Sequence, residues 1–166
     1  ESAASNINAI RGRNGLRIAF TPNSPSHHLL KATADHFDVP ELLPKKGPQR
    51  IETDGSTKAL EKILAKQTDV AVLWEPDVSR ALAQKGIVKI LGTESTRQLI
   101  VDVLLVNRDY GAANPDVVKI LLANYFKALK VYRDQPERLA QEVMVHTKLS
   151  RENVQTMLKG VAWTTL

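Results

Sequence analysis

Hydrophobic and polar positions alternate between strand-like and helix-like spacing along residues 15–106. Short apolar runs predict strands, and they fall at residues 16–20, 50–53, 68–74, 88–91 and 100–106. Apolar residues three or four positions apart predict the helices between them, which begin near Ser24, Ser56 and Asp77. The nearly continuous apolar run 68–74 is typical of a strand covered on both faces, so we expect it at the centre of the sheet.

This alternation predicts an α/β lobe with a central, mostly parallel sheet flanked by helices, followed by an all-helical C-terminal third. Asn114-Pro115 marks the start of a long helix, and two shorter helices are expected at residues 137–146 and 150–159. We therefore divide the chain into a linker (1–14), a ligand-binding lobe (15–113) and C-terminal helices that pack on this lobe (114–166). The final apolar segment holds Trp163 and has no stop signal, so we expect a truncated chain.

Composition narrows the classes of function. The chain has 166 residues, of which 43% are hydrophobic, which is enough for one well-buried core. No stretch reaches the roughly 20 apolar residues that cross a bilayer, so no direct membrane insertion is expected. Cysteine is absent, and this excludes disulfides, thiolate catalysis and thiolate metal sites.

A net charge of +5 suggests binding to nucleic acid, but the distribution of the charge argues against it. Lys58, Lys62 and Lys66 recur every four residues of one predicted helix, interleaved with Glu61, as on a solvent-exposed face. Aromatic residues make up only 5% of the chain, too few for a stacking surface. We therefore predict no nucleic-acid partner.

The predicted sheet places candidate ligand-binding residues together. The carboxyl ends of parallel strands meet at one edge, and the following helices begin there with unpaired N–H groups and partial positive charge. Hydroxyl and N–H donors at such helix starts could hold an oxyanion. The candidates are Asn23, Ser24, Ser26 and His27 at one helix start and Ser56 and Thr57 at the next. The alternative, that Ser24 and Ser56 are ordinary helix caps, stays open at this point.

Three further residues are ambiguous. Trp74 ends a predicted buried strand, so it is either a cleft wall that stacks on ligand or a core residue. Glu75 could satisfy the dipole of the next helix, or it could face the cleft, where it would repel an oxyanion and attract an amine. Asp102 interrupts an apolar run, so it must be exposed, paired with Arg97 or Arg108, or directed into a polar cleft.

The sequence lacks the residue arrangements that catalysis would require. Ser26 and His27 are adjacent, which turns their side chains about 100° apart on a helix, and no Gly-x-Ser-x-Gly turn is present. The histidines 27, 28 and 36 do not share a helix face with a carboxylate in the His-Glu-x-x-His manner. We therefore predict no catalytic residue, no metal site and no cofactor.

Several segments resemble the nitrate, sulfonate and thiamine-precursor branch of the type II periplasmic substrate-binding proteins. They are residues 16–19 with 24–27, residues 69–77 (DVAVLWEPD), and residues 100–106 before Asn114-Pro115. The resemblance spans residues 15–163. Its most specific part is Trp74-Glu75-Pro76, which corresponds to the family's Trp-Asp/Glu-Pro at the ligand cleft, and residues 74–82 are most similar to members fused to an outer-membrane-protein-A-like domain.

The resemblance implies the second lobe of such a receptor plus its C-terminal helices, with residues 7–13 as the linker into that lobe. Its implied partners are a small solute, a first lobe missing from this sequence, and a membrane permease of the ABC-transporter type. The hydroxyl and N–H donors at the predicted helix starts favour an anionic solute. The resemblance also implies hinge closure and a periplasmic or other extracytoplasmic location. The same fold serves as a ligand-sensing domain in signalling and transcription-regulatory proteins, and a pyrimidine-synthase-like enzyme shares its wider architecture.

Overall fold

The computed structural model of the chain describes residues 7–43, 45–96 and 99–164. The chain forms two compact units, Glu1–Ile100 and Val101–Leu166, which we call the first and second unit. None of the described helices combines the length and the apolar character that crossing a membrane requires.

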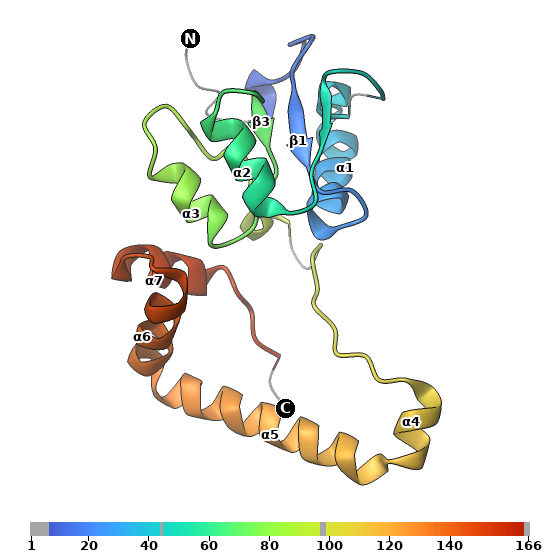
Figure 1. The fold of residues 1–166 in the computed structure, drawn as a ribbon, viewed down its shortest axis with the longest axis vertical. Helices are drawn as coiled ribbons and strands as arrows, with labels where there is room; N and C mark the ends of the chain where they lie inside the picture. Colours follow the sequence, from blue (N-terminus) through green and yellow to red (C-terminus); the bar gives the residue numbers. More distant parts are fainter. Residues whose placement is uncertain (1–6, 44, 97–98, 165–166) are drawn as a thin grey trace. The chain divides into compact units, whose positions relative to one another are not determined.

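A three-stranded parallel sheet forms the centre of the first unit (Figure 1). Its strands are β1 (Ile18–Phe20), β2 (Arg50–Glu52) and β3 (Val70–Ala71), in the order β2-β1-β3. In register, Ile18 aligns with Arg50 on one side and with Val70 on the other. The prediction that residues 68–74 form the central strand was wrong: β1 is central and fully buried, whereas β3 is paired only with β1 and half-buried.

Helices follow each strand, as expected: α1 (Pro25–Phe37), α2 (Ser56–Leu64) and α3 (Asp77–Leu82). Short 3-10 turns lie at η1 (Ile7–Ala9), η2 (Pro40–Leu42) and η3 (Thr93–Ser95). The chain steps outward from β1 to β2 and then back across β1 to β3. Because such crossovers are right-handed, α1 and α2 cover opposite faces of the sheet. The predicted α/β fold with a parallel sheet is confirmed.

The main apolar core lies between β1 and α1. Ile18 and Phe20 of β1 pack in one cluster with Leu30 and Ala34 of α1. The remaining buried members of this cluster are Ile7, Ile10, Val39 and Leu42. Two of them come from the segment predicted to be a linker, so this segment contributes apolar side chains to the core.

An ion pair fixes the opposite, amino-terminal edge of the sheet. The guanidinium of Arg17 donates to both carboxylate oxygens of Asp69, at 3.0 and 2.8 Å, and the backbone N–H of Arg17 donates to the same group at 2.8 Å. These hydrogen bonds hold the pKa of Asp69 below its ordinary value. The start of β1 is thereby joined to the residue that precedes β3.

The second unit is helical, with α4 (Arg108–Ala113), α5 (Pro115–Asp134), α6 (Pro136–Thr147) and α7 (Arg151–Lys159). The last three confirm the predicted helices, while α4 was not predicted. Asn107 caps α4 by accepting from the N–H of Tyr110 at 3.0 Å, and Ser150 caps α7 in the same way.

Two predicted strands, residues 88–91 and 100–106, do not form among the described residues. Their apolar composition is right for a strand, but neither segment pairs with the sheet, and a strand requires a partner for its backbone groups. The proposed division at residue 113 and the packing of residues 114–166 on the lobe stay predictions.

Candidate functional site

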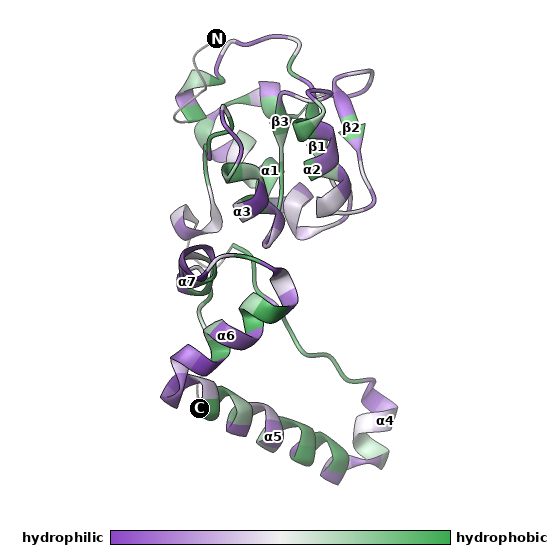
Figure 2. Cartoon of the chain, turned by 60° about the vertical axis from the view of Figure 1, so that its left-hand side comes forward, coloured by the Kyte–Doolittle hydropathy of each residue, from purple (hydrophilic) through white to green (hydrophobic). Residues whose placement is uncertain are grey.

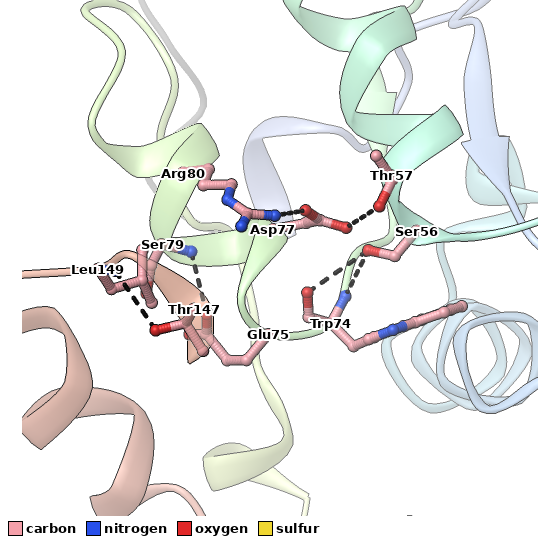
Figure 3. Close-up of polar contacts among 9 residues, drawn as sticks. All are labelled: Ser56, Thr57, Trp74, Glu75, Asp77, Ser79, Arg80, Thr147 and Leu149. Carbon is pink, nitrogen blue, oxygen red and sulfur yellow. Dashed lines mark hydrogen bonds and ion pairs between the residues drawn. The ribbon is translucent and has the colours of Figure 1, made fainter. Parts of the chain in front are cut away.

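Hydrogen bonds join the three loops at the carboxyl edge of the sheet. Thr21 after β1 and Thr53 after β2 place their hydroxyl oxygens 3.5 Å apart. Ser56 at the start of α2 accepts from the N–H of Trp74 at 3.1 Å, and Thr57 donates to Asp77 of α3 at 3.0 Å (Figure 3). The starts of α1, α2 and α3 therefore lie along one edge, as the parallel topology requires.

At the start of α1, the serine hydroxyls shape the loop. Ser24 occupies the N-cap position, yet its hydroxyl donates to the carbonyl of Thr21 at 2.6 Å and caps no helical N–H. The buried hydroxyl of Ser26 accepts from the N–H of Thr21 at 3.1 Å. The backbone N–H groups of Ser26 and His27 have no hydrogen-bond acceptor among the described residues.

The start of α2 also has backbone N–H groups without an acceptor. Its N-cap residue is Gly55, which has no side chain to accept a hydrogen bond. Ser56 directs its hydroxyl to Trp74, both accepting from the N–H and donating to the carbonyl oxygen at 3.4 Å. Within the described part of the chain, the N–H groups of Ser56, Thr57 and Lys58 find no acceptor.

The start of α3 differs, because its N–H groups are already paired. The carbonyl of Trp74 accepts from the N–H groups of Asp77 and Val78, and the carboxylate of Glu75 accepts from the N–H of Ser79 at 3.2 Å (Figure 3). Glu75 thus satisfies the helix dipole, which is one of the two alternatives left open by the sequence. Two of the three helix starts, those of α1 and α2, keep unpaired donors.

His27 adds a titratable group to the α1 start. Its ring lies 4.9 Å from the ring of Phe20, and its Nδ1 accepts from the N–H of Asn23 at 3.4 Å. Asn23 adopts a φ of 52°, a left-handed conformation that asparagine tolerates better than most residues. Burial lowers the pKa of His27, and the charges of Arg50 and Lys31 lower it further. These effects favour the neutral form of His27 over the charged form.

Trp74 and Asp102 complete the set of predicted site residues. The side chain of Trp74 is 44% exposed, so it is not a core residue, and its proposed contact with ligand stays a prediction. Asp102 belongs to the second unit and is exposed, and no ion pair joins it to Arg108. Arg97 lies outside the described residues. The edge of the first unit thus brings together the other eight predicted residues, whereas Asp102 is in the other unit.

Sequence reasoning missed three residues that hold this edge together. Thr21 and Thr53 join the first two loops, and the hydroxyl of Thr53 also donates to the carbonyl of Gly55 at 3.1 Å. Asp77 is 2% exposed and pairs with both Thr57 and Arg80. Each of the two threonines is the first residue after a strand, a position that could have identified them.

Among the described residues, no group of three or more His, Asp or Glu could hold a metal ion. Two surface pockets, of about 410 and 140 Å³, lie near the C-terminal end of α1 and before β1, at the amino edge of the sheet. Both are therefore on the opposite side from the helix starts.

The comparisons with known proteins concern the fold. No family model matches the sequence, and no curated protein does. Among solved structures, the chain is similar to the periplasmic aliphatic sulphonate binding protein SsuA from Escherichia coli, with 20% identity and a TM-score of 0.72. The fold is that of a type II periplasmic binding protein. The match covers 98% of this chain but 53% of SsuA, so the chain spans about half the length of that structure.

Replacing the hydroxyl that joins α2 to the third loop should destabilise the first unit. In Ser56→Ala the N–H of Trp74 loses its acceptor in a part-buried hydrogen bond, so we expect the free energy of unfolding to fall by about 1 kcal/mol in urea denaturation. Ser95→Ala, at an exposed serine of η3, is the matched control and should cost less than about 0.5 kcal/mol. Equal losses in both variants would contradict this assignment.

The pKa of His27 should lie below the ordinary histidine value of about 6.5. The folded chain favours neutral His27, so its contribution to stability is complete above pH 6.5 and decreases as the pH falls below that value. Proton NMR of the imidazole across this range measures the pKa directly. Arg50→Gln removes one positive charge near the ring and should raise the value; a wild-type pKa above 6.5 would refute the prediction.

Proposed function

We propose that this chain is the solute-binding lobe of an ABC-transporter-type receptor and that it binds a small anionic solute at the carboxyl edge of its sheet. One observation carries the proposal. The starts of α1 and α2 present unpaired backbone N–H groups at the same edge, and nearby hydroxyls are engaged elsewhere and cap neither helix. Unpaired donors at the positive end of a helix suit an oxyanion.

Two of the acidic residues near this edge already accept hydrogen bonds or form ion pairs within the protein. Glu75 accepts from the N–H of Ser79, and Asp77 is paired with Arg80 at 2.9 Å and with Thr57. Their negative charges are therefore partly balanced within the protein. Asp54, next to the start of α2, is exposed and opposes an anion, so the balance of charge favours an oxyanion by a small margin.

The fold supports binding as the function. SsuA is a periplasmic protein that binds aliphatic sulphonates, and a sulphonate presents oxyanion oxygens of the kind that helix starts accept. By this analogy, the lobe works outside the cytoplasm, a first lobe closes over the solute by hinge motion, and a membrane permease receives it. Binding then requires neither a cofactor nor catalysis.

Anions should bind this edge, and the binding should be weak. One wall buries far less of a ligand than the roughly 70–90% that deep pockets achieve, so we expect a Kd above 1 µM for ethanesulphonate or phosphate in calorimetry. Adding the anion should shift the amide NMR signals of the non-proline residues in 21–27 and 53–58. Asn23→Asp, which keeps the tolerance for positive φ but adds negative charge beside α1, should weaken binding at least about threefold.

Asn14→Asp is the matched control. Asn14 is exposed and precedes β1, at the opposite edge of the sheet, so this change alters the net charge equally without affecting the helix starts. Equal effects of the two variants, or shifts produced by ethylammonium but not by anions, would overturn the proposal.

Glu75→Gln tests the charge of the solute. Because glutamine can still accept from the N–H of Ser79, we expect the anion affinity to stay within about twofold of wild type or to improve. A solute with a cationic group would instead lose roughly 30-fold, or about 2 kcal/mol, the scale for breaking a desolvated charge pair. Glu61→Gln, on the exposed face of α2, is the control in the same calorimetric titration.

A further inference from the structure

Asn14 and Gly15 form a turn shortly before β1, in a hydrophilic stretch of the chain (Figure 2). Both residues are exposed. Gly15 has a φ of 83°, a left-handed conformation that glycine adopts without strain. The side-chain amide of Asn14 has no hydrogen-bond partner in the described part of the chain, so it is free to turn toward the backbone that follows it.

The backbone N–H of Gly15 is also unpaired, because no acceptor for it lies among the described residues. Hydrogen bonding of the sheet begins later in the chain, where the N–H of Ile18 donates to the carbonyl of Gln49 at 2.7 Å. Glycine has no side chain that could shield its nitrogen. The nitrogen of Gly15 is therefore free to approach the side-chain carbonyl carbon of the preceding asparagine.

We propose that Asn14 is a site of spontaneous deamidation in the folded chain. The nitrogen of Gly15 attacks Cγ of Asn14, the bond from Cγ to the side-chain nitrogen breaks, and the proton of the attacking nitrogen leaves with that group as ammonia. The cyclic succinimide that remains is opened by water at either of its carbonyl carbons, which gives aspartate or isoaspartate. Water is the only co-reactant, and nothing is oxidised or reduced.

The other asparagines of the described chain lack this combination of features. Asn114 is followed by a proline, which has no N–H. The N–H that follows Asn153 already donates to the carbonyl of Ser150 at 3.0 Å, and Asn124 lies inside α5, where the next N–H is bonded within the helix. The remaining three precede residues whose side chains crowd the attacking nitrogen, and they are Asn8, Asn23 and Asn107.

Deamidation at this position should leave the first unit folded. The ion pair between Arg17 and Asp69 and the hydrogen bond of Ile18 hold β1 in the sheet, and both lie beyond the turn. Isoaspartate adds a methylene group to the backbone outside these contacts. The product carries one additional negative charge at the amino-terminal edge of the sheet, on the opposite side from the helix starts.

Peptide mass spectrometry after incubation in mildly alkaline buffer tests the proposal. Water enriched in the heavy oxygen isotope labels each new carboxylate, so deamidation during the incubation is distinguished from aspartate already present. We expect Asn14 to deamidate at least about tenfold faster than any other described asparagine, because glycine hinders the attack least. The modified chain, separated by ion exchange, should unfold at the same urea concentration as the unmodified chain.

Gly15→Ala should slow deamidation of Asn14 at least about tenfold, because a methyl group then crowds the nitrogen. Gly12→Ala is the matched control: Gly12 is also exposed, with a φ of 76° and open space where a Cβ would lie, so this variant carries the same backbone penalty without altering the reacting nitrogen. Equal rates in the two variants would overturn the proposal. If neither variant folds, the ranking of asparagines in the unmodified sequence decides, and a rate at Asn14 no faster than at the others would refute it. Unfolding of the modified chain at a lower urea concentration would contradict its tolerance by the fold.

Discussion

The parallel pairing of β1 with a strand on each side is the constraint on which the first unit depends. Once β2 and β3 run in the direction of β1, every strand must end at one edge, and every following helix must begin there. The buried side chains of β1 make this arrangement costly to change, since Ile18 and Phe20 belong to the main core. The candidate binding edge is therefore a consequence of the topology and not of any single motif.

The hydroxyl groups at this edge then determine which backbone N–H groups stay unpaired. Ser24 and Ser56 lie where helix caps are expected, but the Ser24 hydroxyl bonds to Thr21 of its own loop and the Ser56 hydroxyl bonds to Trp74 of the loop after β3. The loops are thereby fixed while the helical N–H groups stay unpaired. At α3 the opposite happens, because Glu75 caps the helix. In the proposed function, the unpaired backbone donors are what recognises the anion, and the side chains hold those donors in place.

The two units differ in how well their own residues bury their apolar surface. The first unit has a core in which β1 is fully buried. In the second unit α5 has no buried residue, and residues 101–106 expose apolar side chains in succession. Hydrophobic burial is the main favourable contribution to folding, so the second unit gains less stability from its own residues than the first unit does.

The sequence by itself determined the described helices other than α4 and the α/β order, because hydrophobic periodicity and turn residues act over a few neighbours. It also identified eight residues that the structure brings to one edge of the sheet. It could not determine which strand is central, since the apolar run 68–74 would suit either position, or that residues 100–106 stay unpaired, since pairing depends on a distant partner. Only the tertiary structure decided that Glu75 caps α3 and that Ser24 does not cap α1, because a side chain with several hydrogen-bond partners in reach selects among them through three-dimensional proximity.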